Sequence, residues 1–218
     1  MSKSPRNWPQ GVQYLHSPVY HSSIPPSIVS LLRNSAASSS STSISSLSSI
    51  PIAPSSHIPN QTTIQKIELA SHPAHGQLGL FASKKIPPNT MIIYYLGQVH
   101  AEQRTTSDYD LSLIRLPIQE NISIASIDDP GYIHIGIDAE FMGNEARCIN
   151  DYRGIAQRPN ALFKEVKHPT TGQIRMSVWS GTKPIPKHEE ILVSYGKGWW
   201  KSCVLGERHQ IRRHQKFV

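Results

Sequence analysis

The chain has 218 residues, a formal net charge of +7, a hydrophobic content of 38% and a mean hydropathy of −0.35. This length and hydropathy predict one soluble domain with tails. No stretch reaches the roughly 18 to 20 apolar residues that span a bilayer, and the N-terminus lacks the basic and apolar segments of a secretory signal, so no membrane or secreted protein is expected. Cys148 and Cys203 lie far apart without a C-x-x-C pair, which indicates neither a disulfide framework nor a metal site.

The basic excess lies in the two tails of the chain. Residues 1–65 contain Lys3, Arg6 and Arg33 and no acid, and residues 201–218 contain several basic residues against Glu207 alone, which leaves the middle near zero. Basic arms of this kind can contact the phosphates of nucleosomal DNA without sequence preference. They can equally be solvated tails without a partner, and the sequence leaves both interpretations open.

Composition divides the chain into four parts. Residues 1–33 carry aromatic residues and a short apolar run, so we expect this segment to dock on the domain. Residues 34–64 are rich in serine and are expected to be a disordered linker, because such a composition buries too little apolar surface to offset its ordering entropy. Residues 65–200 are expected to form the domain, and residues 201–218 a basic tail.

The domain shows short apolar or alternating runs separated by Pro, Gly and Asn, a pattern typical of many short strands. Short helices are expected around Ala139–Ile149 and after Gly198. The strands are expected near Ile67–Ala70, Leu80–Ala82, Met91–Val99, Tyr109–Arg115, Ile133–Asp138, Leu162–Val166, Arg175–Trp179 and Glu190–Tyr195.

Five sequence strings follow one another along the domain. They are HGQLGLFASKKI (75–86), IIYYLG (92–97), SDYDLSL (107–113), IGIDAEFMGNEARCIND (135–151) and EEILVSYG (189–196). Each alone is an ordinary turn or strand, but in this order, over about residues 66–200, they resemble the SET domain of protein lysine methyltransferases. The resemblance implies a mainly β fold with short helices, the SET-domain β-clip of several small sheets with a C-terminal pseudoknot. It also implies S-adenosylmethionine as the methyl donor.

The first string is similar to the glycine turn that opens the family's donor site. The resemblance implies donor contacts by Gly76, Leu78, Gly79 and Leu80. Glycine suits such a turn because a Cβ would block the close approach of the backbone to a ligand. A Gly-x-x-Gly pair alone is a weak signal, and the strings that follow it give it weight.

Three tyrosines fall at positions that the family uses. Tyr195 matches the catalytic tyrosine and Tyr95 matches an aromatic residue of the lysine channel, so the resemblance gives both a catalytic role. Tyr109 matches a tyrosine that flanks the donor. Phe163 and Trp179 are candidates for the channel position that sets the number of methyl groups. Without the other strings, Tyr95 and Tyr195 would be ordinary strand tyrosines.

The fourth string is similar to the family's I-D-A-x-x-x-G-N-x-A-R-F-I-N-H element. The resemblance implies that Asn150 holds parts of S-adenosylmethionine, that Arg147 supports the loop and that Asp151 contacts the donor. The chain departs from the family here, because Asp151 replaces a histidine and the run DYRGIAQRPN is longer than the family's equivalent. An aspartate only accepts hydrogen bonds, so the donor group and stacking surface of a histidine are lost.

The family often carries three cysteines after the catalytic tyrosine, which complete a zinc site and cover the lysine channel. This chain has only Cys203 there, so no metal is expected. Trp199 and Trp200 are the candidates for a replacement lid, with Trp199 as a donor contact, since an indole can stack on an adenine or over a methylammonium group. Alternatively, they anchor a terminal helix by packing.

The sequence therefore predicts a methyltransferase that acts on the ε-amine of a lysine in a histone tail or another basic protein. A monomer is expected, in the nucleus or the cytoplasm, with the nucleus favoured by the resemblance. The alternative is a SET-fold module without turnover that binds chromatin or a protein partner. The sequence specifies neither the substrate lysine nor the number of methyl groups transferred.

Overall fold

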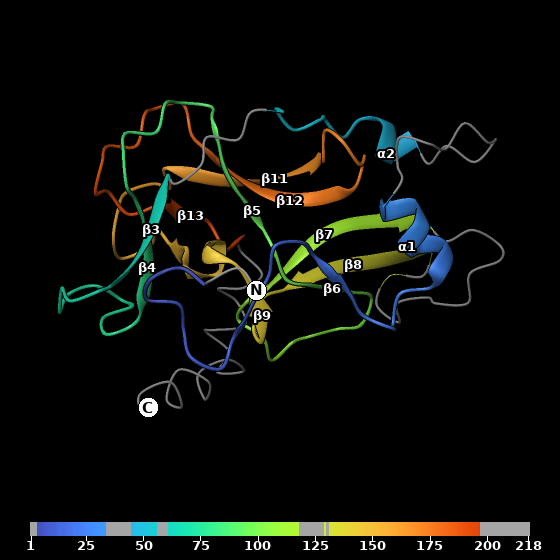
Figure 1. Cartoon of the computed structure of the whole chain (residues 1–218), viewed down its shortest axis with the longest axis horizontal. Coiled ribbons are helices and arrows are strands. Elements are labelled where there is room, and N and C mark those ends of the chain that lie inside the picture. The colour runs from blue at the N-terminus through green and yellow to red at the C-terminus, as the bar shows by residue number, and fades with distance from the viewer. Residues whose placement is uncertain (1–3, 34–44, 56–60, 118–128, 130, 197–218) are drawn as a thin grey trace.

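The computed structural model describes residues 4–33, 45–55, 61–117, 129 and 131–196 (Figure 1). These residues form several small β-sheets with short helices, which confirms the expected mainly β fold. No helix in these ranges is long and apolar enough to cross a membrane. The helices are α1 (Pro26–Arg33), α2 (Ser45–Ser48) and the 3-10 helix η1 (Glu145–Cys148), and the strands are β1 (Gln13–Tyr14), β2 (Val19–Tyr20), β3 (Thr62–Lys66), β4 (Leu78–Ala82), β5 (Met91–Tyr95), β6 (Gln98–His100), β7 (Asp110–Pro117), β8 (Tyr132–Asp138), β9 (Met142–Gly143), β10 (Asn150–Asp151), β11 (Ala161–Lys167), β12 (Ile174–Ser180) and β13 (Leu192–Val193).

A four-stranded sheet in the order β2-β6-β8-β7 carries much of the core. Residues alternate between the two faces of a strand, and in β8 this buries Ile133, Ile135 and Ile137. β7 pairs antiparallel with β8, and its register shifts between Ser112 and Ile114. This irregularity bends the edge strand, and residues of β7 at that point line the cavity described below.

A three-stranded sheet in the order β11-β12-β5 is covered on both faces. Its inner face carries Tyr95 and Phe163 toward the main core. Its outer face carries Tyr94 and Trp179, which pack in a separate small cluster with Ala53. The two tyrosines at the end of β5 therefore serve different cores.

The segment 45–55 covers this outer face and differs from the predicted linker. Leu47 and Ala53 are buried, and the Ala53 amide donates to the Lys167 carbonyl over 2.8 Å. The serine-rich composition concealed these few anchoring residues. Residues 34–44 and 56–60 lie outside the described part of the chain.

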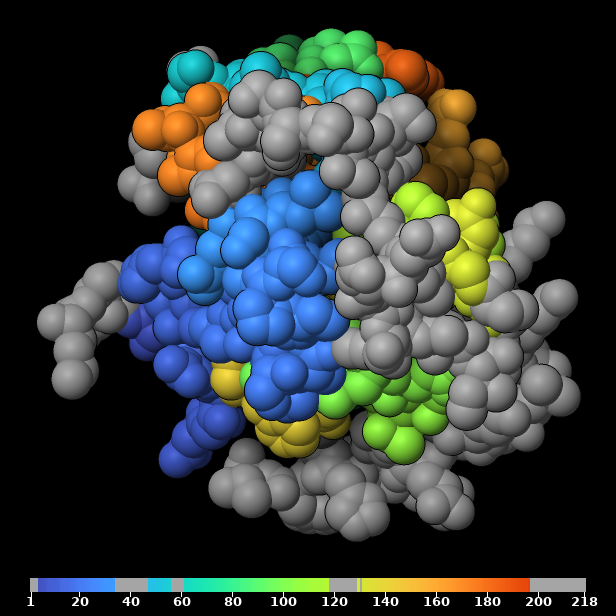
Figure 2. All heavy atoms as spheres, turned by 90° about the vertical axis from the view of Figure 1, so that its right-hand side faces the viewer, coloured from blue at the N-terminus to red at the C-terminus, as the bar shows by residue number. Residues whose placement is uncertain are grey.

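The N-terminal segment packs on the domain through two parallel strand pairings and a helix. β1 pairs with β9, and β2 pairs with β6, so β2 extends the four-stranded sheet. Helix α1 buries Ile28 and Leu32 in the main core. Figure 2 shows this blue segment across the centre of one face of the molecule.

The C-terminal segment of the described chain is bonded on both sides. The Ile191 amide donates to the Leu80 carbonyl of β4 over 2.8 Å. On the other side, β13 pairs in parallel with β10, and the Tyr152 amide donates to the Val193 carbonyl over 3.0 Å. The segment thus passes between two parts of the chain far apart in sequence, as the predicted pseudoknot requires.

Several predicted boundaries are wrong. The strand expected at Ile67–Ala70 lies earlier, as β3, because the antiparallel pairing with β4 ends at Lys66 and Leu78. The strand expected at Met91–Val99 is two strands, broken at Gly97, where a Cβ would collide with the Asp138 backbone. The strand expected at Glu190–Tyr195 is reduced to β13, and the helix expected at Ala139–Ile149 is reduced to η1. The helix expected after Gly198 lies outside the described residues.

The packing of α1 predicts that the N-terminal segment contributes to the stability of the whole domain. Leu32 is 0% exposed, so Leu32→Ala should lower the free energy of unfolding by about 3 kcal/mol, through lost transfer energy and a residual cavity. The measurement is urea unfolding followed by circular dichroism. Ser30→Ala is the matched control because Ser30 is exposed on the same helix. Equal stability of the Leu32→Ala variant and the wild type would show that α1 folds independently of the domain.

Candidate functional site

The described residues enclose a cavity of about 190 Å³ where β5, β7, η1 and β11 meet the segment after β13. Its walls combine aromatic rings with two carboxylates and one guanidinium group. The lining residues are Tyr95, Asp108, Tyr109, Asp110, Leu111, Ser112, Arg147, Ile149, Phe163 and Tyr195. Four residues predicted for the site, Tyr95, Tyr109, Arg147 and Tyr195, therefore come together around one space.

Two tyrosine hydroxyls in the wall donate to main-chain carbonyls. The Tyr195 hydroxyl donates to Ile149 O over 2.6 Å, and the Tyr95 hydroxyl donates to Tyr109 O over 2.7 Å. Burial raises the pKa of Tyr95 well above its usual value, and the neighbouring Tyr195 adds to this shift. A neutral hydroxyl whose proton is already donated takes part in a further hydrogen bond only as an acceptor. The two oxygens are thus arranged to receive a hydrogen-bond donor.

Phe163 completes the aromatic wall, whereas Trp179 does not. The rings of Phe163 and Tyr95 meet edge to face, with centroids 5.8 Å apart and an interplanar angle of 90°. Trp179 lies on the opposite face of the same sheet, where Lys164 Nζ sits 4.7 Å from its ring centroid. Of the two candidates for the position that sets the number of methyl groups, only Phe163 reaches the cavity.

Arg147 links the cavity wall to the loop before it. Its Nε donates to Ala139 O over 2.9 Å, and its guanidinium carbon lies 4.1 Å from the ring centroid of Tyr109. The side chain is buried, and the stacking presses the guanidinium group against the aromatic face. Arg147 therefore ties η1 to the backbone at Ala139 and stacks on the ring of Tyr109.

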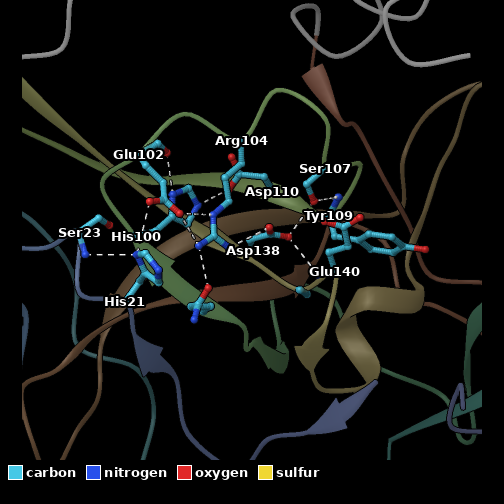
Figure 3. A network of polar contacts seen from close by, with 12 residues as sticks. His21, Ser23, His100, Glu102, Arg104, Ser107, Tyr109, Asp110, Asp138 and Glu140 are labelled. Atoms are coloured by element: carbon cyan, nitrogen blue, oxygen red, sulfur yellow. Dashed lines mark hydrogen bonds and ion pairs between the residues drawn. The ribbon is translucent and has the colours of Figure 1, made fainter. Parts of the chain in front are cut away.

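A polar network behind Tyr109 holds this wall in place (Figure 3). Asp138 accepts from Ser107 Oγ over 2.8 Å and from Arg104 over 3.1 Å, and the Ser107 oxygen in turn accepts from the Tyr109 amide over 3.1 Å. His100 lies between Glu102 O and Asp110 Oδ1, at 2.8 and 2.9 Å. Asp138 is only 3% exposed, and its satisfied carboxylate orders the turn that carries Tyr109 and the acids beside it.

A second cluster surrounds the buried carboxylate of Glu190. Asn150 Nδ2 donates to Glu190 Oε1 over 2.8 Å and to Leu78 O over 3.3 Å. His72 Nε2 lies 2.9 Å from Glu190 Oε2, and His72 Nδ1 accepts from the Ala74 amide over 3.0 Å. Because Nδ1 is an acceptor, Nε2 carries the proton and donates to Glu190.

The glycine turn is shaped by this carboxylate. A Cβ on Gly79 would lie 2.8 Å from Glu190 Oε1, so only glycine leaves room for the carboxylate there. Gly76 has φ of +81°, a backbone conformation that residues with a side chain rarely adopt, and its amide donates to Ile67 O over 2.8 Å. Leu80 is 0% exposed, so its side chain belongs to the core and only its backbone faces the neighbouring strand.

Asp151 joins the two clusters through the backbone of Tyr195. Its Oδ2 accepts from the Tyr195 amide over 2.7 Å, and its Oδ1 accepts from the Arg153 amide over 2.9 Å. The Arg153 guanidinium group adds an ion pair at 3.1 Å. Both oxygens of the carboxylate are therefore engaged by the chain itself. The partner Arg153 comes from the long run that follows Asp151.

The remaining predicted residue, Trp199, lies outside the described part of the chain, as does Trp200. Within that part, no three His, Cys, Asp or Glu side chains are placed to hold a metal ion. Burial raises the pKa of the Cys148 thiol to about 11, so this residue is a protonated core side chain. Three further parts of the two clusters were not predicted, namely Ile149, His72 and the acids beside Tyr109, although the two aspartates of the string SDYD were a visible signal.

Comparison with known proteins gives one family and a set of similar folds. The SET domain family model matches residues 77–196. ATXR5, solved in complex with histone H3.1 mono-methylated on R26, matches with a TM-score of 0.51 at 12% identity, over 86% of this chain and 82% of that chain. Chaetomium thermophilum Polycomb Repressive Complex 2 bound to GSK126 matches with a TM-score of 0.44 at 22% identity, over 66% of this chain and 17% of that chain.

A ctPRC2 structure in an autoinhibited conformation bound to S-adenosylmethionine matches with a TM-score of 0.40 at 21% identity, over 66% of this chain and 16% of that chain. The present chain thus spans less than a fifth of the Polycomb chains that it matches. None of the curated protein sequences matches this chain. The similarity to ATXR5 shows the fold.

The hydrogen bonds that hold β13 predict that the side chain of Asn160 contributes strongly to the free energy of unfolding. Asn160 Oδ1 accepts from the Leu192 amide over 2.8 Å, and its Nδ2 donates to Glu190 O over 2.7 Å. Asn160→Ala leaves these main-chain groups without their partners and should cost about 2–4 kcal/mol of unfolding free energy. Urea unfolding measures this cost, with exposed Gln157→Ala as the control. A loss below about 0.5 kcal/mol would contradict the role given to Asn160.

Proposed function

The chain belongs to the SET-domain family, whose members are protein lysine methyltransferases, and we propose that it transfers the methyl group of S-adenosylmethionine to the ε-amine of a protein lysine. The observation that carries this proposal is the cavity lined by Tyr95, Phe163 and Tyr195, where each of the two tyrosine hydroxyls is oriented by a main-chain carbonyl. A chain of methylene groups that ends in a hydrogen-bond donor suits this space, and lysine is such a side chain.

The amine must lose its proton before it can attack a methyl carbon. With a pKa near 10.4, a lysine amine is less than about 1% neutral at pH 7.4, and a shift of roughly three units corresponds to about 4 kcal/mol. Aromatic walls strip water from the cation and so favour the neutral amine. Asp108 and Asp110 line the same cavity and attract the cationic side chain on its way in.

Besides the loss of the proton, methyl transfer requires that the amine nitrogen be aligned with the methyl group of the donor. The Tyr195 hydroxyl is oriented by Ile149 O, and its oxygen accepts a hydrogen bond from the amine and directs the nitrogen lone pair toward the donor side. The Tyr95 oxygen, oriented by Tyr109 O, lies in the same wall and stabilises polarised hydrogens near it. Asp151 acts through the chain, because its hydrogen bond to the Tyr195 amide fixes the backbone that carries the catalytic ring.

The donor-side residues suit the methyl donor. Gly76 allows the left-handed backbone conformation of the turn, and Asn150 has both amide protons committed to Leu78 O and Glu190, which leaves its Oδ1 to accept from the donor's amino group. When bound there, S-adenosylmethionine supplies an electrophilic methyl group. Donor contacts by Gly79 and Leu80 fall to their backbones. Direct contacts of Asp151 and Trp199 with the donor stay predictions.

The proposed substrate is a lysine in a basic segment such as a histone tail. Two aspartates beside the cavity favour cationic residues around the target lysine. ATXR5, which has a similar fold, was solved in complex with histone H3.1 mono-methylated on R26. Action on chromatin would place the protein in the nucleus.

The catalytic role of Tyr195 predicts a loss of turnover without loss of donor binding. Tyr195→Phe removes the oxygen that orients the amine, so methyl transfer should fall by at least about 100-fold. Donor affinity should stay within about threefold, because the Tyr195 backbone and its bond to Asp151 are unchanged. The measurements are incorporation of labelled methyl groups into a histone panel and a cell extract, and donor titration by calorimetry.

Tyr132→Phe is the matched control, since Tyr132 lies on the surface at the start of β8. Full activity in Tyr195→Phe would remove Tyr195 from the mechanism. A wild type that binds the donor but labels no protein would support the alternative of a SET-fold module without turnover.

The position of Phe163 beside Tyr95 in the cavity wall predicts that a larger side chain there lowers the number of methyl groups transferred to the lysine. Phe163→Tyr adds a hydroxyl inside a cavity of about 190 Å³ and takes space that a methylated amine needs. The highest product state should fall by one methyl group, as measured by mass spectrometry of the reaction products. Trp179→Phe, on the opposite face of the sheet, should leave the product pattern unchanged. The same product pattern in Phe163→Tyr and wild type would show that this wall does not limit methylation.

A further inference from the structure

Two exposed turns far apart in sequence form a lysine-rich surface. The first, residues 83–90, carries Lys84 and Lys85, and the second, residues 181–189, carries Lys183 and Lys187. All four lysines are exposed, and the single carboxylate in these turns is Glu189, whose Oε1 accepts from Asn160. We call this surface the lysine face. In Figure 1 the two turns lie together at the upper left, away from β7 and β8.

The two turns are locked together by main-chain and side-chain hydrogen bonds. Ile86 and Ile185 exchange both of their amide-to-carbonyl hydrogen bonds at 2.9 Å, and both side chains are 0% exposed. Ser180 Oγ donates to Pro87 O over 2.6 Å and accepts from the Thr90 amide over 2.9 Å. Each lysine is within two residues of the Ile86–Ile185 bridge, or roughly 7 Å along an extended chain. The backbone positions of the four lysines are therefore fixed relative to one another before any partner binds.

The fold separates this positive face from the acids of the domain. The described residues between 102 and 145 carry seven carboxylates, and only Arg104 and Arg115 oppose them. They include Asp108 and Asp110 in the cavity wall and the network behind Tyr109. The near-zero charge of the middle of the chain thus conceals local regions of opposite sign. A polyanion is attracted to the lysine face and repelled from the cavity side.

We propose that the lysine face binds the phosphodiester backbone of a nucleic-acid duplex. Lysine is a compact charge on a flexible stem, which suits phosphate contacts without sequence preference, whereas arginine is the residue for bidentate recognition of bases and carboxylates. The lysine face has no arginine. It also has no exposed large hydrophobic residue among those of the described chain, and a membrane-surface site needs such an apolar anchor. A duplex is therefore favoured over an anionic lipid surface.

The lysine face is distinct from the cavity and does not depend on the proposed methyl transfer. None of its four lysines is among the residues that line the cavity. The basic tails of the chain are present in every variant, so their contribution to binding is constant in the comparison below.

The test is the binding of the full-length chain to a fluorescein-labelled 30-base-pair DNA duplex, followed by anisotropy from 50 to 200 mM salt. Each phosphate contact contributes about 0.9 to the slope of log K against log salt concentration. Lys183→Ala combined with Lys187→Ala should therefore reduce the slope by about 2 and weaken binding at 100 mM salt by roughly tenfold or more. An RNA duplex should show the same loss, because the contact is to the backbone.

The matched control is Lys66→Ala combined with Lys164→Ala, which removes the same charge from β3 and β11. This variant should keep the wild-type slope and an affinity within about twofold. Thermal unfolding verifies that both variants are folded. An unchanged slope in the Lys183 and Lys187 variant, or an equal loss in the control, overturns the proposal. Binding to phosphatidylserine vesicles that depends on these lysines, without such dependence for duplexes, also overturns it.

Discussion

Both halves of the site depend on the hydrogen bonds that hold residues 188–195 from two sides. On one side this segment bonds to β4, and on the other it pairs with β10 and is fastened by Asn160. A strand that is paired on both sides cannot shift its register without breaking both sets of bonds. Glu190 and Tyr195 both lie on this segment. The backbone therefore fixes the Glu190 carboxylate cluster relative to the cavity.

The change from histidine to Asp151 and the longer run after it act as one unit. A buried carboxylate is costly unless it is paired and hydrogen-bonded. Asp151 finds its partners in the Tyr195 amide and in Arg153, and Arg153 belongs to that longer run. The longer run thus supplies a partner, Arg153, that offsets the cost of burying the Asp151 carboxylate. It preserves the position of Tyr195, so the altered residue alone is weak support for a loss of activity.

Sequence patterns predicted the parts of the structure that have a local signal. The apolar pattern at Ile133–Asp138 predicted the strand that became β8, and the ordered strings predicted the tyrosines Tyr95, Tyr109 and Tyr195 that line one cavity. The strings carry this information because each one is a short segment of fixed local conformation.

The parts that were missed depend on contacts between distant segments. β1 and β2 are two residues long and exist only through pairing with β9 and β6, so no periodicity marks them. β3 is mostly polar and is defined by its pairing with β4. The hydrogen bond between His72 and Glu190 joins residues 118 positions apart, and a lone histidine in a turn gives no sign of it.

Charge is the property for which the sequence total is least informative, because a sum does not record position. The middle of this chain is nearly neutral in sum, yet the fold places Asp108 and Asp110 in the cavity wall and four lysines on the two locked turns. A nucleosome has the complementary arrangement, with basic protein tails and an anionic duplex. On the two proposed assignments, a basic tail enters on the acidic side while the duplex lies on the lysine face, so neither ligand blocks the other. Opposite charges on separate faces also orient the domain before contact, since each face repels the wrong ligand.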